Sequence, residues 1–245
     1  MKVISVINLK GGVGKTTTVV NMAAILARDY DRKVLVVDAD PQANATYFFG
    51  AENRPNTLHD LMVGRDIADC IYDTPVPWVS IIPAEIGLIM LDAGLGTDMD
   101  RLSRLRHQLE ALEGVDFVLI DCPPSFTTMS CAAILASEDV IIPVKPDGFV
   151  MGGLRELSAQ IAAVRKVDAH VNVAGALVTM WHNSEAVRAG EEALRASAIP
   201  VFDTVIRRTD KVDESTYARQ TLDTWSPYSS AGRDYKSFVA EYMGV

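Results

Sequence analysis

Short apolar runs alternate with longer amphipathic stretches along most of this chain. The runs VLVVD at residues 34–38 and FVLID at residues 117–121 are apolar at successive positions, which is typical of parallel strands covered on both faces. The pattern predicts strands over Lys2–Asn8, Lys33–Asp38, Trp78–Pro83, Asp116–Asp121, Val140–Val144, Val171–Thr179 and Val201–Arg207.

The stretches between these strands carry apolar residues at helical spacing. One of them places Leu154, Leu157, Ile161 and Val164 on a single helix face. This alternation predicts a single-domain α/β fold over residues 1–245, a mostly parallel twisted sheet with helices on both faces. In such sheets ligands bind beyond the carboxyl ends of the strands, so we expect functional residues there. The expected helices are Lys15–Asp29, Met99–Leu112, Gly152–Val167, Glu185–Ser197 and Gly232–Met243.

Composition narrows the class of protein. No apolar run in the 245 residues approaches the roughly 20 residues that cross a bilayer, and the N-terminal run is too short for a signal peptide. Three cysteines, Cys70, Cys122 and Cys131, are too few for a disulfide framework, which favours a reducing, cytoplasmic location. A formal net charge of −9 argues against a protein that coats nucleic acid over its whole surface, and leaves a local basic patch open.

A glycine-rich segment, KGGVGKTT at residues 10–17, directly follows the first expected strand. Against the phosphate-loop pattern G-x-x-x-x-G-K-[ST], Leu9 occupies the first glycine position, while Gly14, Lys15 and Thr16 fit. Glycines let several backbone N–H groups point at one anion, and the next helix adds its positive N-terminal end. We therefore expect Lys15 on the β- and γ-phosphates of a nucleotide and the Thr16 hydroxyl on Mg²⁺. Further nucleotide contacts are expected from Gly11, Gly12, Val13, Gly14 and Thr17.

Aspartates end two of the expected strands. One ends in Asp38-Ala39-Asp40-Pro41-Gln42 and another in Asp121-Cys122-Pro123-Pro124-Ser125. A carboxylate that closes an apolar strand beside a polyphosphate can hold Mg²⁺ or its water shell. We expect Asp121 to hold the metal ion and Asp38 to support its water shell. We expect Asp40 to orient or deprotonate the water that attacks the terminal phosphate. Each aspartate could instead cap the following turn, since Asp-Pro commonly opens one.

KGGVGKTT resembles the deviant Walker A motif of the ParA/MinD family of ATPases, whose signature lysine lies five residues before the loop lysine. Lys10 stands at that position. The segment DADPQ-x-N-A-T, ending at Thr46, and the segment DCPPS resemble the A′ and Walker B regions of the branch that partitions chromosomes and plasmids. The resemblance extends from Lys2 to about Glu241 and is strongest in the first 46 residues and around Asp121.

The resemblance implies a P-loop fold and a Mg²⁺-dependent ATPase that dimerises around ATP and is reset by hydrolysis to ADP and phosphate. It implies catalytic roles for Lys10, Lys15 and Asp40, with Lys10 reaching the phosphates of the partner in a homodimer. It also implies a ParB-like centromere-binding protein as the stimulating partner, and a cytoplasmic protein that associates with the nucleoid when ATP is bound. No DNA-reading domain is expected before the first strand.

The side of the site that would hold adenine matches the family less closely. Thr179-Met180 ends a strand as the family's T-M pair does, but Trp181-His182-Asn183 follows in place of an acidic residue and an arginine. The sequence VIRRT at residues 205–209 stands where the family has V-I-P-R-N. By position, we expect Met180, Arg207 and Thr209 to contact the base.

Partition ATPases of this kind bind DNA nonspecifically as ATP-bound dimers, through basic residues in the C-terminal part. Residues 1–122 carry 11 basic and 17 acidic residues, and residues 123–245 carry 12 and 15, so the second half is only slightly less acidic. Interleaved acidic residues leave a mixed, solvated surface as the alternative interpretation. The best candidate DNA-binding cluster is Arg207, Arg208, Lys211 and Arg219.

Other functions remain open from the sequence. A MinD-type ATPase acting on a membrane or protein cargo would end in a basic amphipathic helix, whereas the charges at 233, 234, 236 and 241 sum to zero, which favours a packed helix and no membrane partner. A tyrosine-kinase relative would use the tyrosines at 228, 235 and 242, whose spacing of seven is more simply one helix face. An iron–sulfur reductase would need two cluster cysteines in glycine-rich loops. A nucleotide-dependent scaffold with negligible turnover would keep the same loop.

Overall fold

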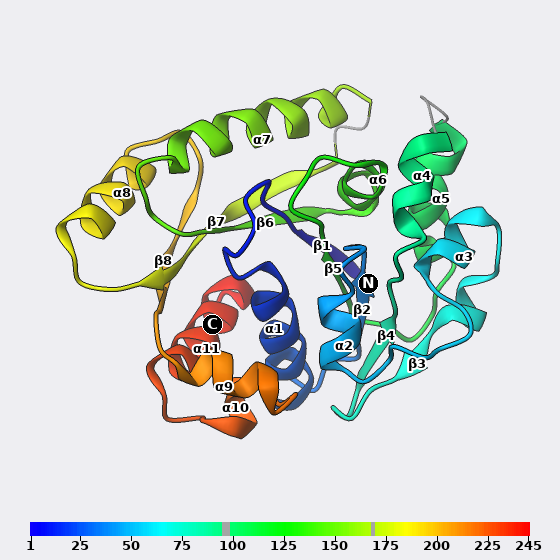
Figure 1. The fold of residues 1–245 in the computed structure, drawn as a ribbon, viewed down its shortest axis with the longest axis horizontal. Coiled ribbons are helices and arrows are strands. Elements are labelled where there is room, and N and C mark those ends of the chain that lie inside the picture. The colour runs from blue at the N-terminus through cyan, green and yellow to red at the C-terminus, as the bar shows by residue number, and fades with distance from the viewer. Residues whose placement is uncertain (95–98, 168–169) are drawn as a thin grey trace.

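The computed structural model describes residues 1–94, 99–167 and 170–245 (Figure 1). Its strands form one eight-stranded sheet in the order β3-β4-β2-β5-β1-β6-β7-β8. Every described strand pair is parallel except β3 with β4, which confirms the expected mostly parallel sheet. The strands are β1 (Lys2–Val6), β2 (Val34–Asp38), β3 (Tyr72–Asp73), β4 (Val79–Ile82), β5 (Phe117–Asp121), β6 (Asp139–Val144), β7 (Asn172–Trp181) and β8 (Val201–Arg207).

The expected strands and helices all form, and their ends agree with the expected ones to within two residues. The helices of nine residues or fewer and the two-residue strand β3 were not among the expected elements, because their sequences have no periodic pattern long enough to predict them. The helices are α1 (Lys15–Asp29), α2 (Asn44–Phe48), α3 (Leu58–Val63), the 3₁₀-helix η1 (Ile67–Cys70), α4 (Leu88–Gly94), α5 (Met99–Glu110), α6 (Thr128–Ala136), α7 (Val150–Arg165), α8 (Glu185–Arg195), α9 (Lys211–Tyr217), α10 (Leu222–Trp225) and α11 (Ser230–Met243).

Helices cover both faces of the sheet, as Figure 1 shows. One buried cluster joins Ile4 and Val36 of the sheet to α1, α2, α10 and α11. The other joins Val37 and Ile120 to α3 through α8. Successive strand residues alternate between these two clusters, which is why a run such as VLVVD is apolar at every position before its aspartate.

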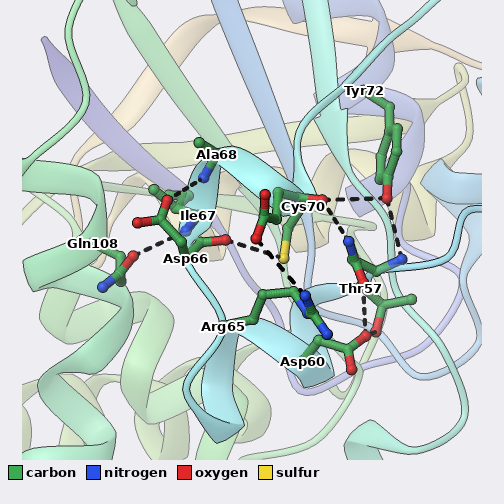
Figure 2. Close-up of polar contacts among 11 residues, drawn as sticks. Thr57, Asp60, Arg65, Asp66, Ile67, Ala68, Cys70, Tyr72 and Gln108 are labelled. Atoms are coloured by element: carbon green, nitrogen blue, oxygen red, sulfur yellow. Dashed lines mark hydrogen bonds and ion pairs between the residues drawn. The ribbon is translucent and has the colours of Figure 1, made fainter.

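One corner of the second face is held by side-chain caps (Figure 2). The N–H and the hydroxyl of Thr57 both donate to Oδ2 of Asp60, at 2.8 and 3.2 Å, in a capping box at the start of α3. Gln108 of α5 accepts the N–H of Ile67 at 3.0 Å, which ties η1 to the neighbouring helix. Cys70 is fully buried here, and burial raises the pKa of its thiol to about 11, so it is a core residue of low reactivity.

The C-terminal helix α11 packs into the core, as its apolar face predicted. Tyr235, Phe238 and Val239 are buried against the sheet and α1. Tyr242 donates its hydroxyl to Oδ2 of Asp139 in β6 at 2.7 Å, which fixes the end of the helix. Within the ranges that the structure describes, no helix is long and apolar enough to cross a bilayer.

Candidate functional site

The carboxyl ends of β1, β2 and β5 meet at one edge of the sheet, because β5 pairs in parallel with both of the other strands. The register places Asp121 opposite Val6 on one side and Asp38 on the other. The glycine-rich loop follows β1 directly, so the structure brings together the loop and the aspartates that the sequence analysis selected. Lys15, Asp38, Asp40 and Asp121 are all buried at this edge.

The loop between β1 and α1 owes its shape to glycines. Gly12 and Gly14 have φ angles of +67° and +88°, which residues with a side chain rarely adopt. Thr179, near the end of β7, donates its hydroxyl to the carbonyl of Val13 at 2.8 Å. This bond ties the loop to a strand on the other side of β6. The loop therefore curls at the N-terminus of a 15-residue helix, where backbone N–H groups favour an anion.

The two lysines of the loop have different surroundings. Lys15 is 8% exposed and donates from Nζ to the carbonyl of Lys10 at 3.2 Å. Burial lowers the pKa of Lys15, and the nearby carboxylates of Asp121 and Asp40 act against that shift. The side chain of Lys10 is 43% exposed and forms an ion pair with Asp147, between β6 and α7. Lys15 is thus inside the site, whereas Lys10 extends along its rim.

Thr16 and Asp121 form a pair that suits a hard cation. The Thr16 hydroxyl donates to Oδ2 of Asp121 at 2.6 Å, while the buried Oδ1 of Asp121 has no hydrogen-bond partner among the described residues. Burial raises the pKa of Asp121 well above its usual range, and the neighbouring Asp38 carboxylate adds to the rise. A buried carboxylate without full hydrogen bonding, next to a hydroxyl, is the environment that Mg²⁺ stabilises, so these residues fit the ion.

Phosphate and water would have to supply the remaining metal ligands. In the described part of the chain, no three or more His, Cys, Asp and Glu side chains form a group that could hold a metal ion. Mg²⁺ commonly binds through one or two protein groups together with phosphates and water, rather than in an all-protein cage. The arrangement at Thr16 and Asp121 therefore suits an ion that a bound polyphosphate would also coordinate.

Asp38 is engaged by the protein more fully than Asp121. Its Oδ2 accepts both the N–H and the hydroxyl of Thr46 at 2.7 Å, and its Oδ1 accepts the N–H of Asp40 at 3.2 Å. Burial raises the pKa of Asp38 to about 6, against the effect of these hydrogen bonds. Asp40 accepts the N–H of Gln42 at Oδ1, at 2.9 Å. Asp38 thus organises the segment that carries Asp40.

A cavity of about 300 Å³ lies beside the loop, between the ends of β7 and β8 and α11. Met180, Arg207 and Thr209, the residues expected at the base, all line it, together with Gly14 and Thr17 at the start of α1. Small-molecule sites typically have volumes of roughly 300–1,000 Å³, so this cavity is large enough for a base.

Two of the cavity residues are held in defined positions. Arg207 forms a bidentate pair with Asp234 of α11, with Nε 2.9 Å from Oδ2 and Nη2 2.6 Å from Oδ1. Met180 has a φ of +52°, which is a strained conformation for a residue with a side chain. Strain of this kind is concentrated at binding sites, because the surrounding structure must maintain it.

The expected DNA-binding cluster is largely paired with its own carboxylates. Arg219 also lies over the ring of Tyr47, 3.6 Å from its centroid. Arg208 takes part in none of the ion pairs in the described ranges. Three of these four residues are therefore already paired with carboxylates of this chain. The pairs are Arg207–Asp234 at 2.6 Å, Lys211–Glu214 at 2.7 Å and Arg219–Glu52 at 2.7 Å.

Two contacts at the site were missed by the sequence analysis. Asp147 pairs with Lys10 across 137 positions of the chain, and Thr179 bonds Val13 across 166. Thr179 belongs to the T-M pair at 179–180 that resembles the family, and Asp147 stands three residues after the end of β6. That position was the available signal, but it does not reveal which side chain each one meets.

Comparison with known proteins gives consistent matches. A family model described as an AAA domain matches residues 1–173. The chain is 34% identical to the chromosome-partitioning ATPase Soj of Thermus thermophilus over 245 residues, which cover 98% of this chain and 94% of that protein. It is similar to the structure of Cyanothece McdA in complex with ATP, with a TM-score of 0.90, 25% identity and coverage of 100% and 97%. It is also similar to the septum site-determining protein MinD of Pyrococcus horikoshii with Mg-ADP, with a TM-score of 0.81, 25% identity and coverage of 98% and 95%.

Proposed function

The chain belongs to the ParA/MinD family of ATPases, and we propose that it is a Soj-type partitioning ATPase that binds ATP with Mg²⁺ and hydrolyses it to ADP and phosphate. The observation that carries the proposal is the buried Oδ1 of Asp121, which has no hydrogen-bond partner within the described ranges although it lies beside Thr16 and the Lys15 loop. The relatives support the chemistry. Thermus Soj is a chromosome-partitioning ATPase, and the similar McdA and MinD structures hold ATP and Mg-ADP.

The phosphate end of the nucleotide belongs at the loop between β1 and α1. The backbone N–H groups of residues 11–17 surround the phosphates, and Lys15 contributes a buried positive charge that gains an anionic partner. Thr16 and Asp121 would hold Mg²⁺, with Asp38 supporting its water shell. The ion, when bound, neutralises the negative charge on the β- and γ-phosphate oxygens during transfer.

Asp40 orients the attacking water and accepts its proton. It is 6% exposed, and its Oδ1 is held by the N–H of Gln42. Its second carboxylate oxygen accepts no hydrogen bond from the described part of the chain, which leaves it available to a water molecule. Phosphoryl transfer requires an in-line nucleophile far more than it requires a strong base, so a fixed carboxylate at this position is sufficient.

The base of the nucleotide occupies the cavity between β7 and β8, against Met180, Thr209 and Arg207. Because the Arg207 guanidinium is paired with Asp234, Arg207 lines the base cavity in a fixed position and does not move to meet the base. A nucleotide bound in this way would have its phosphates near Asp121, at the end of β5, and its base in the cavity beside α11.

Two copies of the chain close around ATP in this proposal, and Lys10 of each copy reaches the phosphates of the other. Lys10 pairs with Asp147 of its own chain, so dimer formation requires that this pair be exchanged for a phosphate of higher negative charge. Hydrolysis removes the terminal phosphate and favours the return of Lys10 to Asp147. The nucleotide therefore controls the oligomeric state.

Partitioning requires a partner, and we assign a ParB-like centromere-binding protein that stimulates hydrolysis. The ATP-bound dimer would bind DNA nonspecifically and associate with the nucleoid, because dimerisation doubles whatever basic surface one copy presents. Arg208 carries most of that surface, since Arg207, Lys211 and Arg219 are paired with carboxylates. Residues 1–245 act as a single ATPase domain in this account.

Phosphate release from ATP, with and without DNA and a centromere-binding partner, tests the proposal. Wild-type protein is expected to release phosphate slowly and faster with the partner. Asp40→Ala is expected to retain ATP binding and to lose at least about a hundredfold in turnover, because the water loses its orienting group. ATP binding without turnover in the wild type would support a nucleotide-dependent scaffold instead, and equal turnover in Asp40→Ala would contradict the assigned mechanism.

A further inference from the structure

Thr46 of α2 is a buried residue that the mechanism above does not use. It is 1% exposed, and its N–H and hydroxyl both donate to Oδ2 of Asp38 at 2.7 Å. Its hydroxyl oxygen also accepts the N–H of Ala84, just after β4, at 2.8 Å. The hydroxyl therefore acts as donor and acceptor at once and joins three segments: the end of β2, α2 and the segment after β4.

Asp38 passes this constraint to Asp40. One oxygen of the Asp38 carboxylate is fixed by Thr46, and the other accepts the N–H of Asp40 at 3.2 Å. The carboxylate cannot rotate without breaking bonds on both sides. This bond constrains the backbone at Asp40, and the N–H of Gln42 holds Oδ1 of Asp40 at 2.9 Å, so a change in the orientation of Asp38 would displace the Asp40 carboxylate.

We propose that Thr46 is a positioning residue for the hydrolytic step, acting through Asp38 on Asp40. The inference rests on the proposed role of Asp40 in orienting water. Loss of the hydroxyl leaves Asp38 with the N–H of Thr46 but removes one of the two charge-assisted bonds from Thr46 that resist its rotation, and it also removes the acceptor of the Ala84 N–H. Small misplacements of a group that orients a nucleophile reduce turnover strongly, while the binding of the phosphates at the loop is unaffected.

A purely structural role for Thr46 would lower stability and leave the turnover of the folded protein unchanged. The chain contains a matched control for this alternative. Thr57 also donates its N–H and hydroxyl to one carboxylate oxygen, that of Asp60, at 2.8 and 3.2 Å, and it is 6% exposed. Its capping box lies at the α3–η1 corner (Figure 2), outside the phosphate site.

The test compares Thr46→Val, Thr46→Ser and Thr57→Val by phosphate release, by binding of a fluorescent ATP analogue and by thermal unfolding. Thr46→Val is expected to lower kcat by about tenfold or more, with KM and analogue affinity within about twofold of wild type. Thr46→Ser restores the hydroxyl, so its kcat is expected within about twofold of wild type. Thr57→Val is expected to lower the unfolding midpoint and leave kcat unchanged. Thr46→Ala, which removes the same hydroxyl and suits a helix, carries the same expectation if the valine variant does not fold.

A wild-type kcat in the folded Thr46→Val or Thr46→Ala protein would overturn the inference, and so would a loss that Thr46→Ser does not restore or that Thr57→Val reproduces. Asp40→Ala, measured in parallel, separates this inference from the proposed function. Wild-type turnover in Asp40→Ala would remove the role of Asp40 itself. An inactive Asp40→Ala beside a fully active Thr46→Val would remove the role of Thr46 alone.

Discussion

The phosphate-loop edge and the basic segment from Arg207 to Arg219 are both concentrations of charge, but their charges are satisfied differently. At the loop edge, Lys15 is 8% exposed, and a buried oxygen of Asp121 accepts no hydrogen bond from the part of the chain that the structure describes. In the basic segment, Arg207, Lys211 and Arg219 each have a carboxylate of their own. The charged groups of the first region need a ligand to supply their missing partners, whereas the basic residues of the second region are paired with carboxylates of the same chain. Burial without full pairing thus marks a ligand site better than a cluster of like charges does.

The largest effect is expected from Lys15→Met. The substitution removes the buried cation of the loop and keeps most of its apolar bulk, so ATP affinity should fall at least about a hundredfold. Calorimetric titration with ATP and Mg²⁺ measures it. Lys33→Met is the matched control, because Lys33 is exposed before the amino end of β2, away from the loop. Equal affinity in Lys15→Met and Lys33→Met would show that the loop is not where the phosphates bind.

Asp121→Asn should stabilise the protein without ligand while removing its response to the metal. The variant loses a buried carboxylate that lies beside those of Asp38 and Asp40, which is expected to raise the free energy of unfolding at pH 8. Thermal unfolding with ATP, with and without MgCl₂, should show a magnesium-dependent rise in midpoint for the wild type and none for Asp121→Asn.

The advantage of Asp121→Asn should also shrink as the pH falls. Because burial raises the pKa of Asp121, the folded wild type binds a proton more tightly than the unfolded chain does. The wild type therefore recovers stability as the pH falls through the folded pKa toward the ordinary value of 3.8. A stability difference that is constant from pH 8 to pH 5 would mean that Asp121 has no raised pKa in the folded protein.

A smaller effect is expected when the basic segment is reversed in charge. Arg208→Glu/Lys211→Glu should reduce the retention of DNA by the ATP-bound protein several-fold at low salt, and should flatten its salt dependence. Arg32→Glu/Lys33→Glu introduces the same charge change at two exposed residues before β2 and should leave retention closer to wild type. If the two double variants bind DNA equally, the C-terminal segment is not the DNA surface.

The smallest effect is expected from Arg219→Ala. Its partner Glu52 and the Tyr47 ring are both at the surface, where an ion pair contributes little. ATP turnover should stay within about twofold of wild type and the unfolding midpoint should change only slightly. A loss of turnover as large as that of Asp40→Ala would place Arg219 in the site and remove the contrast between the two regions.

The sequence was sufficient for the sheet and the phosphate site because both depend on local patterns. Each of these patterns is visible within a short stretch of sequence: strands that are apolar at successive positions, apolar residues at helical spacing in α1 and α7, and the spacing from Lys10 to Thr16. The environment of each charge was not predictable in this way. Glu52 lies 167 positions from Arg219, and no pattern near 219 indicates that the cation is already paired.

The same reason explains why Thr46 was noted only as the end of a motif. Its role depends on Ala84, 38 positions away, whose N–H its hydroxyl accepts, and on the Asp38 carboxylate, to which its hydroxyl donates. Composition was equally limited: a net charge of −9 argued against a surface that is basic throughout and left a local patch open, and only the structure shows that Arg207, Lys211 and Arg219 in the candidate patch are paired with carboxylates.

The central claim is that ATP converts this chain from a monomer into a dimer in which Lys10 leaves Asp147. Light scattering of wild-type protein with ATP, with ADP and without nucleotide measures this directly, with Lys10→Ala as the comparison. The account predicts twice the monomer mass for wild type with ATP, the monomer mass in the other two conditions, and the monomer mass for Lys10→Ala throughout. A wild-type mass that is the same in all three conditions would contradict it.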